Sequence, residues 1–289
     1  MTLSLQVYIP TRSRIGLNKQ VTLRNFLSTS SHRPVLVCRS SEVASHRRYY
    51  DRVLGCPSND IGSTRQWILD NSDADVVVMA DDDMRFSFRP DNSVAKLVPC
   101  ADLGDLLDLI KTCVSKGFIH GGLSARQGNN RYLMGDSRTT MDDGLAFVDN
   151  WRVNNFHFMH REPVLATGVR FEGRDDAGER LVMEDFAFTL GLLLLGHKNR
   201  VIYSYVWNQE ASGKLGGCSD YRTAEMQDRS AKRLHQLHPE FVKLVEKKNL
   251  ESSLSWKEFK VRTDVVISWM KAYEQGLKTR PPVSKRRST

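Results

Sequence analysis

Three consecutive carboxylates, Asp81, Asp82 and Asp83, are the side chains of this sequence best suited to chemistry. They directly follow the apolar run 76–80, which is typical of a strand buried on both faces of a sheet. Alternate residues of an extended chain face the same side, so Asp81 and Asp83 should project together and Asp82 away from them. Adjacent carboxylates repel one another unless a cation lies between them, and Mg²⁺ or Mn²⁺ prefers such ligands. The pattern predicts a divalent-metal site; the alternative is a polar turn after a strand.

Two arginines lie where the first predicted strand ends. That strand covers residues 5–11, and the loop after it reads Thr11-Arg12-Ser13-Arg14. Ligands of open α/β sheets bind at the carboxyl ends of the strands. Arg12 and Arg14 are therefore placed to bind a diphosphate or the edge of a base.

A third arginine, Arg65, falls in the first turn of a helix predicted over residues 62–69, with Ser63 or Thr64 as its hydroxyl cap. The helix dipole disfavours a positive side chain at this position. A functional reason for Arg65 is therefore expected.

A second acidic pair, Glu184 and Asp185, opens a predicted helix whose apolar tail ends at Gly196. Such pairs commonly open helices because they complement the helix dipole. The pair becomes a candidate for chemistry through its distance along the chain from the three aspartates.

The elements that would position these side chains alternate between strands and helices. We expect strands at residues 5–11, 34–38, 75–79, 118–123, 155–160 and 200–205, and helices at residues 18–27, 43–53, 62–69, 102–116, 182–195, 221–237, 239–248 and 256–273. Strand–helix alternation over the first part predicts a parallel, doubly wound half. The span 143–171 should add the mixed part of the sheet.

The positive charge of the chain is concentrated near its carboxyl end. Residues 211–289 hold 17 Lys and Arg against 9 Asp and Glu, whereas residues 1–210 hold 25 of each, so the later segment carries the whole net charge of +8. A neutral body with a basic C-terminal region suggests a polyanionic partner such as nucleic acid. The alternative is a set of solvated, lysine-rich helices.

Several classes of protein are disfavoured. The beginning of the sequence lacks the basic and apolar segments of a signal peptide, and no apolar run is long enough to span a bilayer. The five cysteines are odd in number and contain no C-x-x-C pair, so neither a disulfide framework nor a zinc site is indicated. We expect a protein of the cytoplasm, that of the host if a phage encodes it, without a membrane partner.

An acidic strand end followed about a hundred residues later by an acidic helix start resembles the GT-A class of nucleotide-sugar glycosyltransferases over roughly residues 3–210. More narrowly, the chain resembles the phage glycosyltransferases associated with Tet-like hydroxylases, which modify 5-hydroxymethylpyrimidines in DNA. That resemblance is carried by the segments 62–68, 81–83, 183–185, 216–218 and 221–222.

The resemblance implies an α/β fold: a GT-A (Rossmann-like) nucleotide-sugar-binding sheet with helices on both faces and a basic helical C-terminal region. It implies a catalytic domain over residues 1–210, a helical region over residues 211–280 packed on it, and a disordered tail over residues 281–289.

The resemblance also implies roles for individual residues. Asp83 would coordinate Mn²⁺ or Mg²⁺, Asp81 would contact the ribose or the metal, and Asp82 would help to orient them. The residues expected to bind the uridine diphosphate of the donor are Thr11, Arg12, Arg14 and Arg65. Asp185 would be the catalytic base if the reaction inverts configuration, and Glu184 would bind sugar hydroxyls or the acceptor. GT-A enzymes often supply a further metal ligand, commonly histidine, after the last strand; here Asn208 is the first candidate and His197 the second.

The implied function is metal-dependent transfer of a sugar from a UDP-sugar, UDP-glucose in the first instance, to the hydroxymethyl group of 5-hydroxymethylcytosine in double-stranded phage DNA. The aromatic residues Tyr132, Trp151, Phe156 and Trp207 could stack on an extruded base or could be core residues. The alternatives are a polysaccharide, lipid or protein acceptor, a non-catalytic nucleic-acid-binding protein, and a metal-dependent nuclease or nucleotidyltransferase.

Overall fold

The computed structural model describes residues 2–92, 96–126, 139–209, 221–248 and 261–279. Its strands are β1 Leu5–Pro10, β2 Val35–Arg39, β3 Val53–Cys56, β4 Val76–Ala80, β5 Met84–Phe88, β6 Val98–Pro99, β7 His120–Ala125, β8 Thr139–Asp142, β9 Leu145–Asp149, β10 Phe156–His160, β11 Asn199–Gln209, β12 Val242–Lys248 and β13 Val261–Ile267. Its α-helices are α1 Val21–Thr29, α2 Val43–Arg47, α3 Ile61–Asn71, α4 Leu103–Ser115, α5 Arg161–Ala166, α6 Glu184–Leu194, α7 Ala224–Leu237 and α8 Trp269–Thr279. Three short 3-10 turns lie at Leu17–Lys19, Ser40–Glu42 and Pro90–Asn92.

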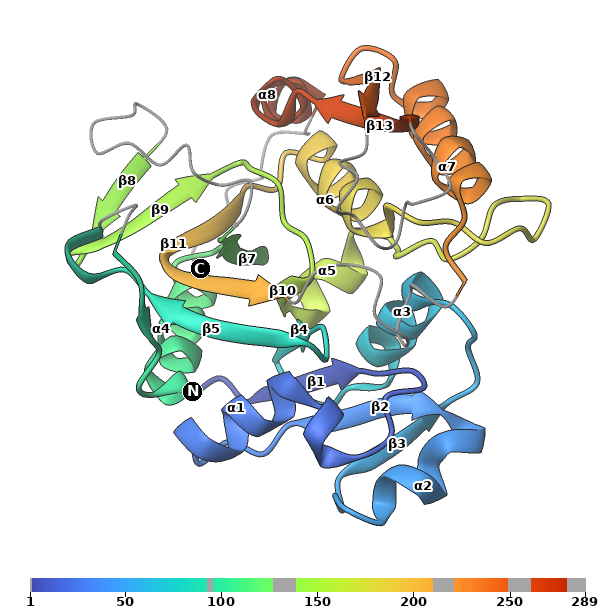
Figure 1. Cartoon of the computed structure of the whole chain (residues 1–289). Coiled ribbons are helices and arrows are strands. Elements are labelled where there is room, and N and C mark those ends of the chain that lie inside the picture. The colour runs from blue at the N-terminus through green and yellow to red at the C-terminus, as the bar shows by residue number, and fades with distance from the viewer. Residues whose placement is uncertain (1, 93–95, 127–138, 210–220, 249–260, 280–289) are drawn as a thin grey trace, which may run out of the picture.

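A mixed, 11-stranded sheet runs through the molecule (Figure 1). Its order is β3-β2-β1-β4-β10-β7-β11-β5-β6, and β9 joins β11 and carries β8. The first four strands in this order are parallel to one another, which confirms the predicted parallel half. All five residues of β4 are buried, as expected of an apolar run with no polar alternation.

Antiparallel strands bring distant parts of the chain to the carboxyl end of β4. Strand β10 lies between β4 and β7 and runs antiparallel to both, so its first residue, Phe156, pairs with Ala80, the last residue of β4. Strand β11 is parallel to β7 and antiparallel to β5, and Gln209 at its end pairs with Met84 at the start of β5. The residues that flank the three aspartates are therefore neighbours of the start of β10 and the end of β11.

Helices cover both faces of this sheet. On one face, Val76 and Val78 of β4 pack with Phe26 of α1 and the apolar side of α4. On the other face, Val77 and Met79 pack with residues of α3, α5 and α6. The expectation of helices on both faces is confirmed, and the alternating directions of the β4 side chains show why every residue of this strand is apolar.

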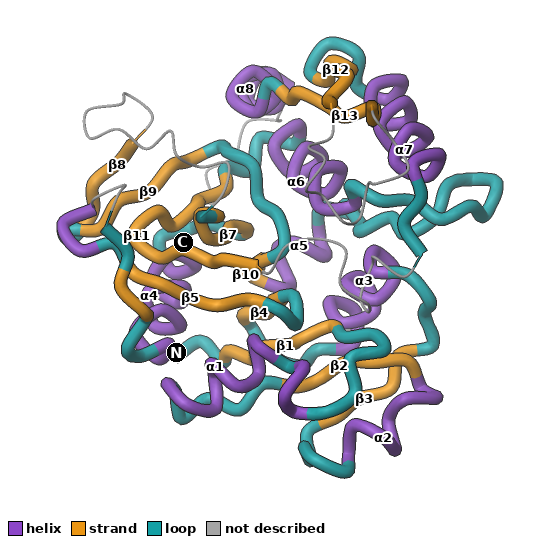
Figure 2. The backbone as a smooth tube through the Cα atoms, viewed as in Figure 1, coloured by secondary structure: helices purple, strands orange, loops and turns teal. Residues whose placement is uncertain are grey.

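The C-terminal region packs on α6, and it is not purely helical. Residues of α7, β12, β13 and α8 form one buried cluster with Val182, Leu190 and Leu193 of the α6 segment. The helix predicted over residues 239–248 is wrong, because β12 occupies this span and pairs antiparallel with β13 (Figure 2). The helix predicted over residues 256–273 is wrong for residues 261–267, which form β13, while α8 begins at Trp269.

Among the other predicted helices and strands, some are confirmed and some differ from the structure. The helix predicted over residues 102–116 is confirmed as α4, with Asp102 as its N-cap. The helix predicted over residues 43–53 ends at Arg47, since residues 53–56 form β3 beside β2. Strand β5 was not predicted. In the parts of the chain that the structure describes, no helix is both long and apolar enough to cross a membrane.

Candidate active site

Asp81 is held from three sides at the end of β4. Its Oδ1 accepts a hydrogen bond from Nη2 of Arg65 at 2.8 Å, and its Oδ2 accepts one from Nδ2 of Asn155 at 2.9 Å. Its main-chain N–H donates to the carbonyl of Asn155 at 3.1 Å. The side chain keeps 21% of its surface exposed, so Asp81 can still meet a ligand.

Asp82 faces the loop after β1, on the side away from Asp81. Its Oδ2 accepts from the Thr11 hydroxyl at 2.6 Å and its Oδ1 forms an ion pair with Arg14. Burial raises the pKa of Asp82 to about 7, although Arg14 acts in the opposite direction. Gln20 donates to the Thr11 hydroxyl and to the Arg14 carbonyl, at 2.8 and 2.7 Å, which fixes this loop.

Arg14 also reaches Asp83, with 2.9 Å between its Nη1 and Oδ2. The other oxygen of Asp83, Oδ1, accepts from Nε2 of Gln209 at 2.6 Å. Burial and the charge of Asp81 raise the pKa of Asp83, whereas Arg14 and Gln209 act against that rise. Asp81 contacts Arg65, whereas Asp82 and Asp83 share Nη1 of Arg14, so the structure does not separate Asp82 from Asp83 as predicted; that Asp81 and Asp83 form a metal site stays a prediction.

Arg65 owes its position to two carboxylates. Helix α3 begins at Ile61 and its N-cap is Asp60, whose Oδ1 accepts from the Ser63 N–H at 2.7 Å. The prediction of Ser63 or Thr64 as the cap is therefore wrong, and Arg65 lies one turn into the helix. Its side chain is 3% exposed and bridges Asp81 and Glu184. These charge-assisted hydrogen bonds stabilise the Arg65 cation near the start of α3. They explain why an arginine is found there although the helix dipole disfavours it.

Glu184 and Asp185 form the first turn of α6, as predicted. The preceding residue, Met183, has a left-handed backbone with φ 67° and provides no side-chain cap. Carboxylates at this end complement the helix dipole. Burial and the adjacent Glu184 raise the pKa of Asp185 to about 7, while Arg65 and Arg222 oppose the rise. A carboxylate with a pKa near neutrality is suited to accept a proton.

Arg12 points away from the aspartates. Its Nη1 donates to the carbonyl of Asn59 at 2.7 Å, and its guanidinium lies 4.9 Å from the centre of the Tyr221 ring. Arg180 lies 5.0 Å from the same centre. Arg12 therefore fixes the loop beside α3, and its role in binding the donor stays a prediction.

Sequence reasoning missed two amides, Asn155 and Gln209. Asn155 Nδ2 donates to Asp81 and, at 3.2 Å, to Oε1 of Gln209, which in turn holds Asp83. Asn208 precedes Gln209 on β11, and successive residues of a strand face opposite sides. Gln209 is the amide that faces the aspartates, and Asn208 as a metal ligand stays a prediction.

The donor set fits a hard divalent cation. In the described parts of the chain no group of three or more His, Cys, Asp or Glu side chains could hold a metal ion. Mg²⁺ in particular is usually held by only one or two carboxylates, with water and substrate phosphates as its other ligands. Asp81 and Asp83 can supply those two carboxylates. Burial is the main reason that the pKa of Asp83 is raised, and Asp81 adds to it although Arg14 acts against it; a cation bound between the two carboxylates would favour their charged forms.

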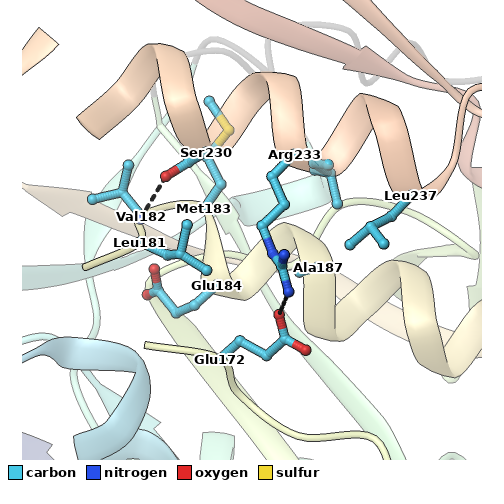
Figure 3. Close-up of a pocket in the computed structure, with 10 residues that line it drawn as sticks. Glu172, Leu181, Val182, Met183, Glu184, Ala187, Ser230, Arg233 and Leu237 are labelled. Carbon is cyan, nitrogen blue, oxygen red and sulfur yellow. Dashed lines mark hydrogen bonds and ion pairs between the residues drawn. The ribbon is translucent and has the colours of Figure 1, made fainter. Parts of the chain in front are cut away.

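Glu184 also lines a cavity between α6 and α7 (Figure 3). The cavity measures about 30 Å³, and its walls include Leu181, Arg233 and Leu237. This volume accommodates water and excludes a sugar nucleotide. The candidate active site is therefore the acidic end of β4, and not this cavity.

The remaining predicted residues are placed as follows. Trp151 is half-buried, while Phe156 and Trp207 are buried. All three pack in apolar clusters, so they are core residues, the second of the two roles considered for them. His197 lies between α6 and β11. Tyr132, the glycine-rich segment 213–218 and the tail 281–289 lie outside the described residues.

A parallel half of the sheet, carboxylates at the end of β4 and an acidic helix start joined to them by Arg65 agree with the expected class, a nucleotide-sugar-dependent glycosyltransferase. The chain belongs to the family described as TET-Associated Glycosyltransferase, whose sequence model matches residues 5–217.

Two groups of solved structures share part of the fold. S. aureus TarS, residues 1–349, solved in complex with UDP-GlcNAc, is 15% identical with a TM-score of 0.48; the match covers 81% of this chain and 67% of that one. GalNAc-T7, solved with UDP, GalNAc and Mn²⁺, is 11% identical with a TM-score of 0.47, over 72% of this chain and 44% of that one. No curated protein sequence matches the chain.

Proposed function

We propose that this protein transfers a sugar from a UDP-sugar, with UDP-glucose as the first candidate, to the hydroxymethyl group of 5-hydroxymethylcytosine in DNA. The observation that carries the proposal is the link from Asp81 through Arg65 to Glu184, which joins the proposed donor site to the helix turn that also holds the candidate base, Asp185, in a chain of the TET-associated glycosyltransferase family.

On the donor side, Arg14 would bind the diphosphate. Its guanidinium already contacts Asp82 and Asp83, and a second anion beside it would share the same donors. Asp83, with Asp81, would hold Mn²⁺ or Mg²⁺, which neutralises the departing diphosphate. Thr11 and Asp82 would keep Arg14 oriented rather than touch the donor, because both are buried and Asp82 pairs with Arg14.

On the acceptor side, Asp185 would take the proton of the hydroxymethyl group in an inverting reaction. As the O–H bond breaks, the oxygen forms a bond to the anomeric carbon, and the bond from that carbon to the diphosphate breaks with its electron pair. Arg65 and Glu184 would fix the position of Asp185 relative to the donor, because Arg65 contacts Asp81 and Glu184 at once.

Double-stranded DNA is the proposed partner of the C-terminal region. The face of the small sheet that points away from α7 carries Lys243, Lys247 and Arg262, of which the last two share Asp264. Binding through phosphates should weaken steeply with added salt. The major groove exposes the C5 substituent of cytosine, and flipping the base would also bring it to the site.

One incubation tests the acceptor, the donor and the reaction. The protein is mixed with Mn²⁺, a panel of nucleotide sugars, and DNA that contains either cytosine or 5-hydroxymethylcytosine, and the DNA is then digested to nucleosides for mass spectrometry. The proposal expects the mass of one sugar to appear on the modified base alone. Hydrolysis of the nucleotide sugar without any gain on DNA would contradict the DNA acceptor and would favour a polysaccharide, lipid or protein hydroxyl.

A further inference from the structure

Asn155, just before β10, has a backbone conformation that few residues adopt. Its φ is 63°, in the left-handed region, where asparagine and glycine are the residues best tolerated. This conformation turns the chain so that the Asn155 carbonyl accepts from the Asp81 N–H while the side chain reaches the Asp81 carboxylate. Asn155 therefore holds Asp81 through both its main chain and its side chain.

Both N–H donors of the Asn155 amide are used. An NH₂ group has two hydrogens, and those of Nδ2 are donated to Asp81 Oδ2 at 2.9 Å and to Gln209 Oε1 at 3.2 Å. The other atom of the amide, Oδ1, accepts from Nδ2 of Asn154. These partners fix which way the Asn155 amide is turned.

Gln209 continues the connection to the second carboxylate. Its Oε1 accepts from Asn155, and its Nε2 donates to Asp83 Oδ1 at 2.6 Å. Asp81 and Asp83 are thus joined by a bridge of two amides, which we call the amide bridge. Each end of the bridge presents N–H donors to a carboxylate, and this stabilises two like charges that would otherwise repel one another.

We propose that Asn155 is a positioning residue of the transferase site, which acts through Gln209 to set the spacing of the Asp81 and Asp83 carboxylates for a divalent cation. The catalytic role of that cation rests on the proposed function. The inference itself concerns the spacing of the two carboxylates and does not depend on the acceptor.

Three features of the contacts support positioning over simple packing. The side chain of Asn155 makes three hydrogen bonds, with Asp81, Gln209 and Asn154, and its main chain makes a fourth with Asp81. It lies at the point where β10 and the end of β4 meet, so its backbone is fixed by the register Phe156 with Ala80. Partners that orient ligand side chains in this way typically change metal affinity when they are removed.

The test uses Asn155→Gly, since glycine keeps the left-handed backbone and removes only the amide. Mn²⁺ affinity is measured by electron paramagnetic resonance with UDP present, together with the thermal midpoint of unfolding and the KM for the nucleotide sugar. We expect Mn²⁺ affinity to fall on the order of 10-fold to 100-fold. The matched control is Asn150→Gly, because Asn150 has the same left-handed backbone, with φ 55°, but its side chain donates to Met270 of α8.

A second variant, Gln209→Met, tests whether Asn155 affects Mn²⁺ binding through Gln209 or independently of it. If the amide bridge is one unit, Gln209→Met should weaken Mn²⁺ binding, and adding Asn155→Gly to it should weaken binding little further. Fully additive losses would overturn the action through Gln209. Equal Mn²⁺ affinity in wild type and in Asn155→Gly, or a loss as large in Asn150→Gly, would overturn the proposal.

The outcome is distinguishable from failure of the proposed function. A wild-type protein that binds Mn²⁺ and UDP and loses this binding in Asn155→Gly supports the amide bridge even if no sugar reaches DNA. A wild-type protein that shows no Mn²⁺ binding with UDP present overturns the amide bridge, whatever its activity on DNA.

Discussion

At the scale of single residues, Asp83 is the carboxylate whose replacement should lower turnover with the least effect on folding. Asp83→Asn removes one charge from a crowded pair, while the amide oxygen can still accept from Gln209 or Arg14, so the fold should persist. We expect turnover to fall by about 100-fold or more, because a metal ion supplies several kcal/mol of transition-state stabilisation. The measurement is single-turnover sugar transfer with circular dichroism to verify folding.

The control for this variant is Asp108→Asn on α4, whose carboxylate forms an exposed pair with Lys111. Exposed pairs contribute little, so this substitution should leave turnover and folding unchanged. Unchanged turnover in Asp83→Asn would remove Asp83 from the metal site.

The contribution of Asp185 to the free energy of unfolding should depend on pH. Its pKa is raised to about 7 in the folded protein, whereas an unfolded aspartate titrates near about 3.9. The folded state therefore binds the proton more tightly, and the destabilisation by Asp185 grows as pH rises from about 4 to about 7. Asp185→Asn should stabilise the protein more at pH 7.5 than at pH 5, as urea unfolding at both pH values would show.

The same substitution tests catalysis. Wild-type turnover should rise through about pH 7 as the pKa of Asp185 is crossed, and Asp185→Asn should show low turnover without that rise. A variant that keeps the wild-type pH profile would exclude Asp185 as the base.

Arg65 should be the most costly single cation to remove. Arg65→Met leaves Asp81 and Glu184 without their shared partner, and breaking a buried pair from one side costs about 3–5 kcal/mol. Denaturant unfolding should report this loss. Arg65→Met combined with Glu184→Gln should recover part of it, because one buried charge is also removed.

The comparison for Arg65 is Arg170→Met, since Arg170 pairs with Asp70 at the surface with a side chain that is 58% exposed. This pair should contribute at most about 1 kcal/mol. A similar loss in both variants would show that the Arg65 pairs are no stronger than a surface pair.

At the scale of elements, the cap of α3 can be tested directly. Asp60→Ala removes the acceptor of the Ser63 N–H and should destabilise the protein by roughly 1 kcal/mol. Asp60→Asn keeps an acceptor and should cost less. Equal stability of the two variants, measured by urea unfolding, would argue against the cap.

The strongest patterns in the sequence identified their elements correctly. The apolar run of β4 and the helical spacing of α4 are local signals that the tertiary structure did not alter. The helix predicted over residues 239–248 was wrong because the helix propensity of its lysines and two glutamates is only a weak guide, and pairing with β13 outweighed it. Strand β5 alternates buried and more exposed side chains at its start, a period that could have revealed it.

Some residues of the candidate site could be predicted from the sequence, and others could not. Asp81, Asp83, Arg14, Arg65 and Glu184 could be proposed because charged side chains near strand and helix ends are visible in a sequence. Asn155 and Gln209 could not, because an amide is chemically ordinary until the register of β10 and β11 places it beside a carboxylate. The only local signal was the Asn-Asn pair before a strand, which is compatible with a left-handed turn.

At the scale of the whole molecule, the C-terminal region should be inseparable from the catalytic part. Val182, Leu190 and Leu193 share a buried cluster with Met226, Trp269 and other residues of that region. A chain that ends at residue 210 should expose this apolar surface and lose cooperative unfolding in calorimetry. A chain that ends at Thr279, after α8, should unfold like the full protein, and a cooperative transition in the shorter chain would show an independent catalytic domain.

The insertion of β10 between β4 and β7 has a consequence for synthesis on the ribosome. After β4 has emerged, which ends at Ala80, 80 more residues must follow before His160 completes β10, and this takes roughly 4 to 16 s at usual elongation rates. During that interval one edge of a five-residue apolar strand has no partner and could pair with another nascent chain. Asp75 before the strand and the three aspartates after it place negative charges at both ends, and charges in such positions hinder aggregation. The carboxylates that would later serve the transferase site would thus first protect the chain while it folds.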